Sequence, residues 1–150
     1  MTLMRATLVL PFIVTTQRTD DMANRYKREA VLESLYTKAK TVCDNVFTSS
    51  RPVATDKMDS FIVVRLPQGI DPYADTHNIA YVQFVSFVRD RQGGVERADV
   101  MEEMIDGISA LFPFNDSLMS CNDTPLVLDT KSDGMGFHST IIQFKIVIKL

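Results

Sequence analysis

The chain of 150 residues contains no tryptophan, only two cysteines and only two histidines. Metal sites and nucleophilic sites usually combine such residues in clusters with defined spacing, so their scarcity leaves little material for either kind of site. Cys43 and Cys121 are far apart in the sequence, and nothing indicates an oxidising compartment. We therefore expect two buried free thiols rather than a disulfide.

Glycine and basic charge are also too sparse to indicate a nucleotide or nucleic-acid site. The pair Gly93-Gly94 lacks the lysine and the following helix of a phosphate loop, so a turn explains it better. The formal net charge is −3 and the isoelectric point is about 5.3. Such a chain has no strongly basic surface with which to grip DNA.

Long apolar runs are absent as well. No run approaches the roughly 20 residues that a membrane-spanning helix needs, so we expect no contact with a membrane. The apolar residues 6–14 faintly resemble a signal peptide, but Pro11 interrupts them and no small-x-small cleavage motif follows. We expect that this segment is not a cleaved leader.

What the sequence does contain is a balanced composition and one long amphipathic strand. Hydrophobic residues make up 45% and charged residues 23%, which is typical of a folded globular domain. Residues 136–150 alternate with a period of two, which predicts a strand with one face in a core. The inward face is expected to carry Thr140, Ile142, Phe144, Ile146 and Ile148.

Similar patterns predict the other elements. Residues 20–47 favour a long helix, residues 61–66 and 78–89 favour strands, and residues 68–75 favour a loop. Asp99 and Glu102 form a capping box before a second helix over residues 100–112. Residues 125–130 then form a strand that pairs with the terminal strand as a hairpin.

The predicted fold class is α+β. We expect an antiparallel sheet of about four or five strands with two helices packed on one face, in the order (arm)-α-β-β-α-β-β. Residues 1–17 are expected to form an extended N-terminal arm or edge strand, because Pro11 is tolerated only at a sheet edge. Residues 18–150 are expected to form a single domain.

Catalytic chemistry finds little support in the sequence. His77 lies in a turn-rich loop and His138 opens the last strand, close in sequence to Asp133. Neither histidine lies in a motif that would position it against a metal or a nucleophile, so we expect no catalytic, cofactor or metal site. The alternative is a small α+β enzyme or ligand-binding domain whose pocket lies near His77, His138 and Asp133.

Apolar side chains exceed what the predicted core requires, both in the arm and on the second face of the strand over residues 78–89. Such a surplus suggests faces covered by another subunit. The candidate interface residues are Leu8, Leu10, Phe12, Ile13, Val14, Tyr81, Val85 and Phe87.

The layout resembles the tail terminator, tail-completion and neck-ring proteins of tailed bacteriophages. Three stretches carry the resemblance. They are a leading helix with Tyr26, Val31 and Leu35 before the strand 61–66, the stretch from Phe84 to Asp90 leading into the helix at 101–108, and the Ser132-Asp133-Gly134 turn into residues 138–144.

The resemblance implies a structural virion protein without catalysis or cofactors. Such proteins form rings of six or twelve copies around the DNA channel at the head–tail junction or the top of the tail. Their partners are copies of themselves, neighbouring portal, connector or tail proteins, and DNA that passes without specific binding. The resemblance implies assembly in the host cytoplasm and a final location in the tail or neck of the virion.

Overall fold

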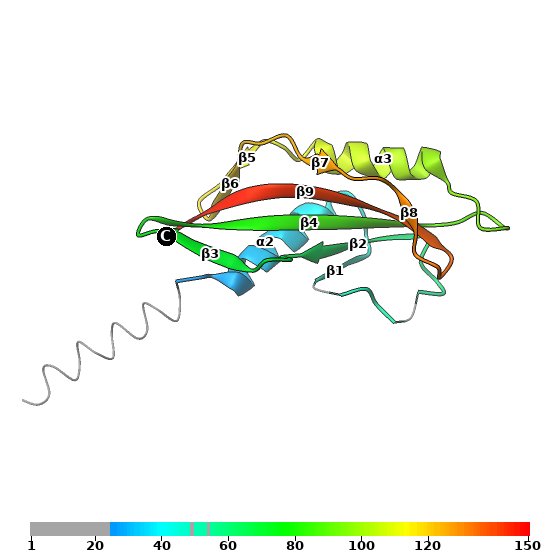
Figure 1. Cartoon of the computed structure of the whole chain (residues 1–150), viewed down its shortest axis with the longest axis horizontal. Helices are drawn as coiled ribbons and strands as arrows, with labels where there is room; N and C mark the ends of the chain where they lie inside the picture. Colours follow the sequence, from blue (N-terminus) through cyan, green and yellow to red (C-terminus); the bar gives the residue numbers. More distant parts are fainter. Residues whose placement is uncertain (1–24, 49, 54) are drawn as a thin grey trace, which may run out of the picture.

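A computed structural model describes residues 25–48, 50–53 and 55–150, and it has the α+β class that the sequence predicts (Figure 1). The predicted arm lies outside the described residues. The same holds for the candidate interface residues Leu8, Leu10, Phe12, Ile13 and Val14.

Two long antiparallel strands form the centre of the sheet. β4 (His77–Arg89) and β9 (Phe137–Lys149) have 13 residues each and pair along their whole length, from His77 opposite Lys149 to Arg89 opposite Phe137. They lie side by side across the molecule (Figure 1). Both strands alternate as predicted. Every second side chain is buried, from Asn78 to Val88 in β4 and from Thr140 to Ile148 in β9.

Short strands extend this pair on both sides. β2 (Ser60–Arg65) and β3 (Ile70–Ala74) pair with β4, and β1 (Val46–Thr48) pairs with β2. On its other edge, β9 pairs with β6 (Met119–Cys121), β7 (Leu126–Val127) and β8 (Lys131–Ser132). β6 also pairs with β5 (Phe114–Asn115).

The described sheet therefore has nine strands, and the prediction of about four or five was too low. β1, β5, β6 and β8 hold two or three residues, too few to show a period of two, so no pattern indicated them. The strand predicted over residues 125–130 is present as the shorter β7, which pairs antiparallel with β9. The sheet is also mixed rather than purely antiparallel, because β1 runs parallel to β2. Residues 68–75, predicted as a loop, include β3.

Two helices in the described residues pack on one face of the sheet, as predicted. α2 spans Arg28–Lys40 and α3 spans Ala98–Ser109. The main core lies between these helices and the sheet. It contains Val31, Leu35 and Ala39 from α2, Met101, Met104 and Ile108 from α3, and inward residues of β2, β4 and β9 such as Ile62, Phe84 and Ile142.

Both predicted helices need corrected boundaries. The first was expected to continue to residue 47, but α2 ends at Lys40 and Val46–Thr48 form β1. The helix has its C-cap at Thr41, and the Asn45 side-chain amide donates to the Ser60 carbonyl at 3.1 Å, which fixes the turn before β1.

The expected capping box of Asp99 and Glu102 is also absent from this structure. α3 begins at Ala98 after an N-cap at Arg97, and no side-chain cap bond is present there. Asp99 instead lies in the first turn, where its charge favours the helix dipole, and it pairs with Arg91 at 3.5 Å.

Candidate assembly surface

The second face of the sheet, opposite the helices, divides into a covered half and an open half. The covered half holds a separate apolar cluster of Phe61, Val63, Val85, Phe87 and Phe137. The rings of Phe61 and Phe87 stack with centroids 4.5 Å apart, and Phe137 meets Phe61 edge to face at 5.2 Å. This half of the face is therefore a second core.

The segment between β1 and β2 covers this second core, with an arginine at its centre. The Arg51 guanidinium lies over the rings of Phe61, Phe87 and Phe137 at 5.3–5.7 Å from their centroids. It also pairs with the Asp133 carboxylate at 3.1 Å, where both side chains are largely buried. Met58 of the same segment packs against the cluster. The covering segment is thus held by cation–π contacts and an ion pair.

Three of the candidate interface residues fall within the described part of the chain, and the structure separates them. Val85 is 4% exposed and Phe87 is 8% exposed, because both belong to the covered cluster. Tyr81 is 40% exposed and lies beyond the cluster on the same face. The apolar surplus that the sequence showed at Val85 and Phe87 is therefore used inside the chain.

The open half surrounds Tyr81. Directly opposed residues of antiparallel strands share a face, so the register places the outward side chains in rows. One row runs across Arg65, Gln83, Gln143 and Leu126, and the neighbouring row holds Tyr81 and Lys145. Gln83 donates its amide to the Gln143 side-chain oxygen at 3.0 Å, which links the two central strands.

Leucines from β7 and its end border this open half. Leu126 is 56% exposed, and Leu128, whose amide donates to the Ile141 carbonyl at 2.9 Å, is 38% exposed. A shallow hollow of about 240 Å³ lies between Tyr81, Leu126 and Lys145. We define the open face as Arg65, Tyr81, Gln83, Leu126, Leu128, Gln143 and Lys145. Among these residues the exposed charges, Arg65 and Lys145, are both positive, and the exposed carboxylate of Asp123 also lines the hollow.

The opposite side of the molecule carries negative charge. Asp99, Glu102 and Asp106 recur on α3 at i, i+3 and i+7, so they form one stripe along the helix. All three are exposed, whereas Met101, Met104 and Ile108 face the core. α3 contains no basic residue.

The alternative pocket near His77, His138 and Asp133 is not assembled. His77 pairs with the end of β9 at Lys149, whereas His138 pairs with Val88 at the other end of β4, so the two imidazoles lie at opposite ends of the sheet. His138 Nδ1 contacts Asp90 Oδ1 at 2.5 Å. The Asp133 carboxylate accepts hydrogen bonds from the Met135 and Phe137 amides and pairs with Arg51. These contacts give it a structural role in the turn before β9.

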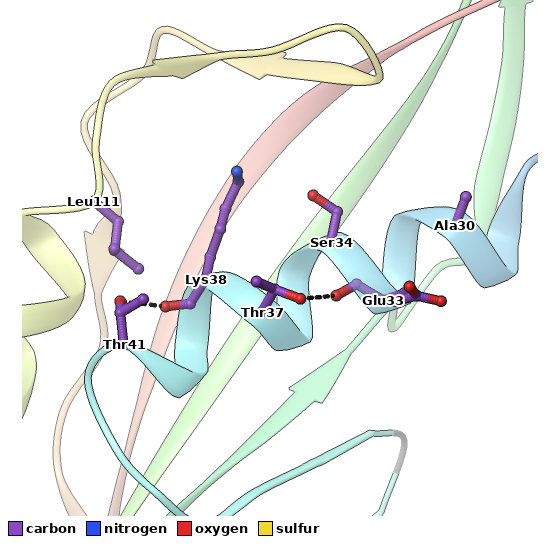
Figure 2. A pocket seen from close by; sticks show the side chains of 7 residues that line it. All are labelled: Ala30, Glu33, Ser34, Thr37, Lys38, Thr41 and Leu111. Atoms are coloured by element: carbon purple, nitrogen blue, oxygen red, sulfur yellow. Dashed lines mark hydrogen bonds between the residues drawn. The ribbon is translucent and has the colours of Figure 1, made fainter.

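A groove of about 440 Å³ runs along α2 between Ala30 and Leu111 (Figure 2). Two of its hydroxyls bond to backbone carbonyls of the preceding turn, because Thr37 donates to the Glu33 carbonyl at 3.0 Å and Thr41 to the Lys38 carbonyl at 2.6 Å. The Lys38 ammonium pairs with Asp116 at 3.0 Å. These polar groups hold the chain together and do not converge on a reacting atom.

Two titratable groups near this region have shifted pKa values. Burial alone would raise the pKa of Asp116, but hydrogen bonds from the Met119 amide, the Lys38 ammonium and the Leu118 amide outweigh it and lower that pKa. Burial raises the pKa of the Cys121 thiol. Cys121 and Cys43 are both buried and free, as the sequence predicted, and the raised pKa of Cys121 disfavours its reactive thiolate.

Within residues 25–48, 50–53 and 55–150, no group of three or more His, Cys, Asp or Glu side chains is arranged to hold a metal ion. Among the same residues, neither helix is long and apolar enough to cross a bilayer.

Sequence reasoning missed most of the open face. Arg65, Leu126, Leu128 and Lys145 were not among the candidate interface residues, although the alternation of the long strands places Lys145 on the outward face. The two leucines lie in the strand predicted over residues 125–130, but their place on the open face follows only from the pairing with β9.

No protein-family model matches the chain, and no curated protein matches it. Among solved structures, a protein whose name states no function is similar in fold, with a TM-score of 0.58 and 15% sequence identity. The similarity covers 83% of this chain and 94% of that one. At this identity the likeness concerns the fold alone.

Proposed function

We propose that this chain is a structural virion protein of a tailed bacteriophage that forms a ring around the DNA channel, at the head–tail junction or the top of the tail. It joins assemblies and performs no catalysis. Its partners are further copies of itself, six or twelve by resemblance, and neighbouring portal, connector or tail proteins.

The observation that carries the proposal is the pair of unlike surfaces on opposite sides of the fold. The open face combines exposed Tyr81, Leu126 and Leu128 with positive charge, and the far side presents the acidic stripe of α3. Rings grow through heterologous contacts between two different surfaces of each copy, and this chain has two such surfaces.

The electrostatics also suit a channel for DNA. A strongly basic lumen would hold phosphates through counterion release and slow the passage of DNA. The net charge of −3 avoids such retention.

Removal of the gene from a phage that encodes this chain tests the proposal. We expect unjoined heads and tails, or tails of abnormal length, and restoration of normal particles when the gene is supplied in trans. Electron microscopy of the particles gives the readout. Normal infectious particles that lack the protein would overturn the proposal.

A further inference from the structure

The open face combines exposed apolar side chains with two cations, and nothing in the described part of the chain covers it. Tyr81 is 40% and Leu126 is 56% exposed, whereas the adjoining half of the same face is fully covered by the chain itself. Aromatic side chains such as Tyr81 are enriched in protein–protein contacts, which also contain polar and charged side chains.

The two cations of the open face favour an occupant that carries negative charge. Arg65 and Lys145 stand on either side of Gln83 and Tyr81, on outward positions of β2 and β9. Neither forms a salt bridge within the described residues, where other cations such as Lys38 and Arg51 are paired. A surface with exposed carboxylates would complement these two cations.

The chain itself presents such a surface. The stripe of Asp99, Glu102 and Asp106 faces away from the sheet, and Glu102 and Asp106 form no salt bridge within the described residues. Val95, an exposed apolar residue, precedes α3 in the sequence by three positions. Because α3 packs on the face opposite the open one, both surfaces of one copy can be engaged at once.

We infer that the acidic stripe of α3 in one copy docks on the open face of the next copy, with Glu102 and Asp106 facing Arg65 and Lys145. The inference rests on the proposed head-to-tail ring and names its contact. The contact is heterologous, so each copy uses a different surface toward each neighbour and the chain of contacts closes only as a ring.

Charge reversal tests the pairing. The variant R65E/K145E makes the open face negative, and E102K/D106K makes the stripe positive, so each should weaken self-association of the full chain about tenfold or more. Analytical ultracentrifugation and native mass spectrometry measure the effect. Added salt should weaken the wild-type assembly, because these charges are exposed.

Recombining the variants distinguishes a specific contact from a general charge effect. The chain that carries all four substitutions should assemble again, because its positive stripe meets its negative face. An equimolar mixture of the two double variants should also assemble, with the variants alternating around the ring. Circular dichroism and thermal melting check that each variant is folded.

Matched controls carry the same change in charge on α2. R28E/K40E corresponds to R65E/K145E, and E29K/E33K corresponds to E102K/D106K; all four control positions are exposed on α2. Both controls should assemble like the wild type.

Assembly of the folded double variants at wild-type strength would overturn the inference. So would failure of the four-substitution chain to recover, or a wild-type chain that stays monomeric up to about 1 mM. The proposed function fails separately: normal phage particles without the gene would reject the virion role and leave the contact standing.

Discussion

At the scale of single residues, Asp116 shows how one carboxylate organises a turn. Its side chain accepts hydrogen bonds from the Leu118 and Met119 amides at 2.9 Å and pairs with Lys38. It thereby ties the β5–β6 hairpin to α2. The side chain of Asp116 is 38% exposed, so solvent screens part of the ion pair.

Asp116→Asn should keep an oxygen for the two amides and lose the charge that faces Lys38. Because the folded pKa of Asp116 lies below its ordinary value of 3.8, its charge stabilises the fold above that pH and stops doing so as pH falls through the folded pKa. We expect the variant to be less stable by about 0.5–1 kcal/mol at pH 7, with the difference shrinking below about pH 4.

Urea denaturation of both proteins at pH 7, 5 and 3 measures this difference. Lys38→Met serves as the control, since it removes the same ion pair from the other side. A deficit of equal size at all three pH values would contradict the assignment of the lowered pKa to the charged form.

At the scale of elements, α3 lies close to the segment that follows α2, and the two meet at Gly107 and Val42. A Cβ placed on Gly107 would lie 2.9 Å from Cγ1 of Val42, which is closer than carbon atoms tolerate. Val42 is β-branched and has little rotameric freedom to move aside. Gly107 therefore allows α3 to lie close to the segment that follows α2.

Gly107→Ala should destabilise the wild type by about 1 kcal/mol net, because the steric cost exceeds the gain in helix propensity. In a Val42→Ala background the clash disappears, so the same substitution should stabilise the protein by roughly 1 kcal/mol. Thermal or urea denaturation of the four chains gives the coupling energy. A substitution effect of the same sign in both backgrounds would show that Val42 is not the obstacle.

At the scale of the whole molecule, the described residues already contain two closed apolar clusters. One lies between the helices and the sheet, and the other lies beneath the segment that carries Arg51. The N-terminal arm lies outside the described residues, and its role in assembly stays a prediction.

Deletion of residues 1–14 should leave the fold intact and weaken assembly, since the described clusters bring together buried side chains from residues 31–148. Circular dichroism and the melting temperature should change little, while sedimentation should show smaller species. Global unfolding of the truncated chain would mean that the arm belongs to the core.

The sequence by itself determined the α+β class, the two long central strands and the core face of α3. These features depend on side chains two to four positions apart, so local periodicity reports them directly. The sequence could not determine β1, β5, β6 and β8, which hold two or three residues and are stabilised by pairing with neighbouring strands rather than by their own pattern.

The tertiary structure alone decided which part of the second face is open. Val85, Phe87 and Tyr81 look equivalent in sequence, because all three alternate outward on β4. Arg51 and Phe137, which lie far away in the chain, cover the first two and leave Tyr81 exposed. The same is true of His77 and His138, which antiparallel pairing of β4 and β9 places at opposite ends of the sheet. Contacts between distant segments carry no local signature, so burial and the separation of these residues appear only once the chain has folded.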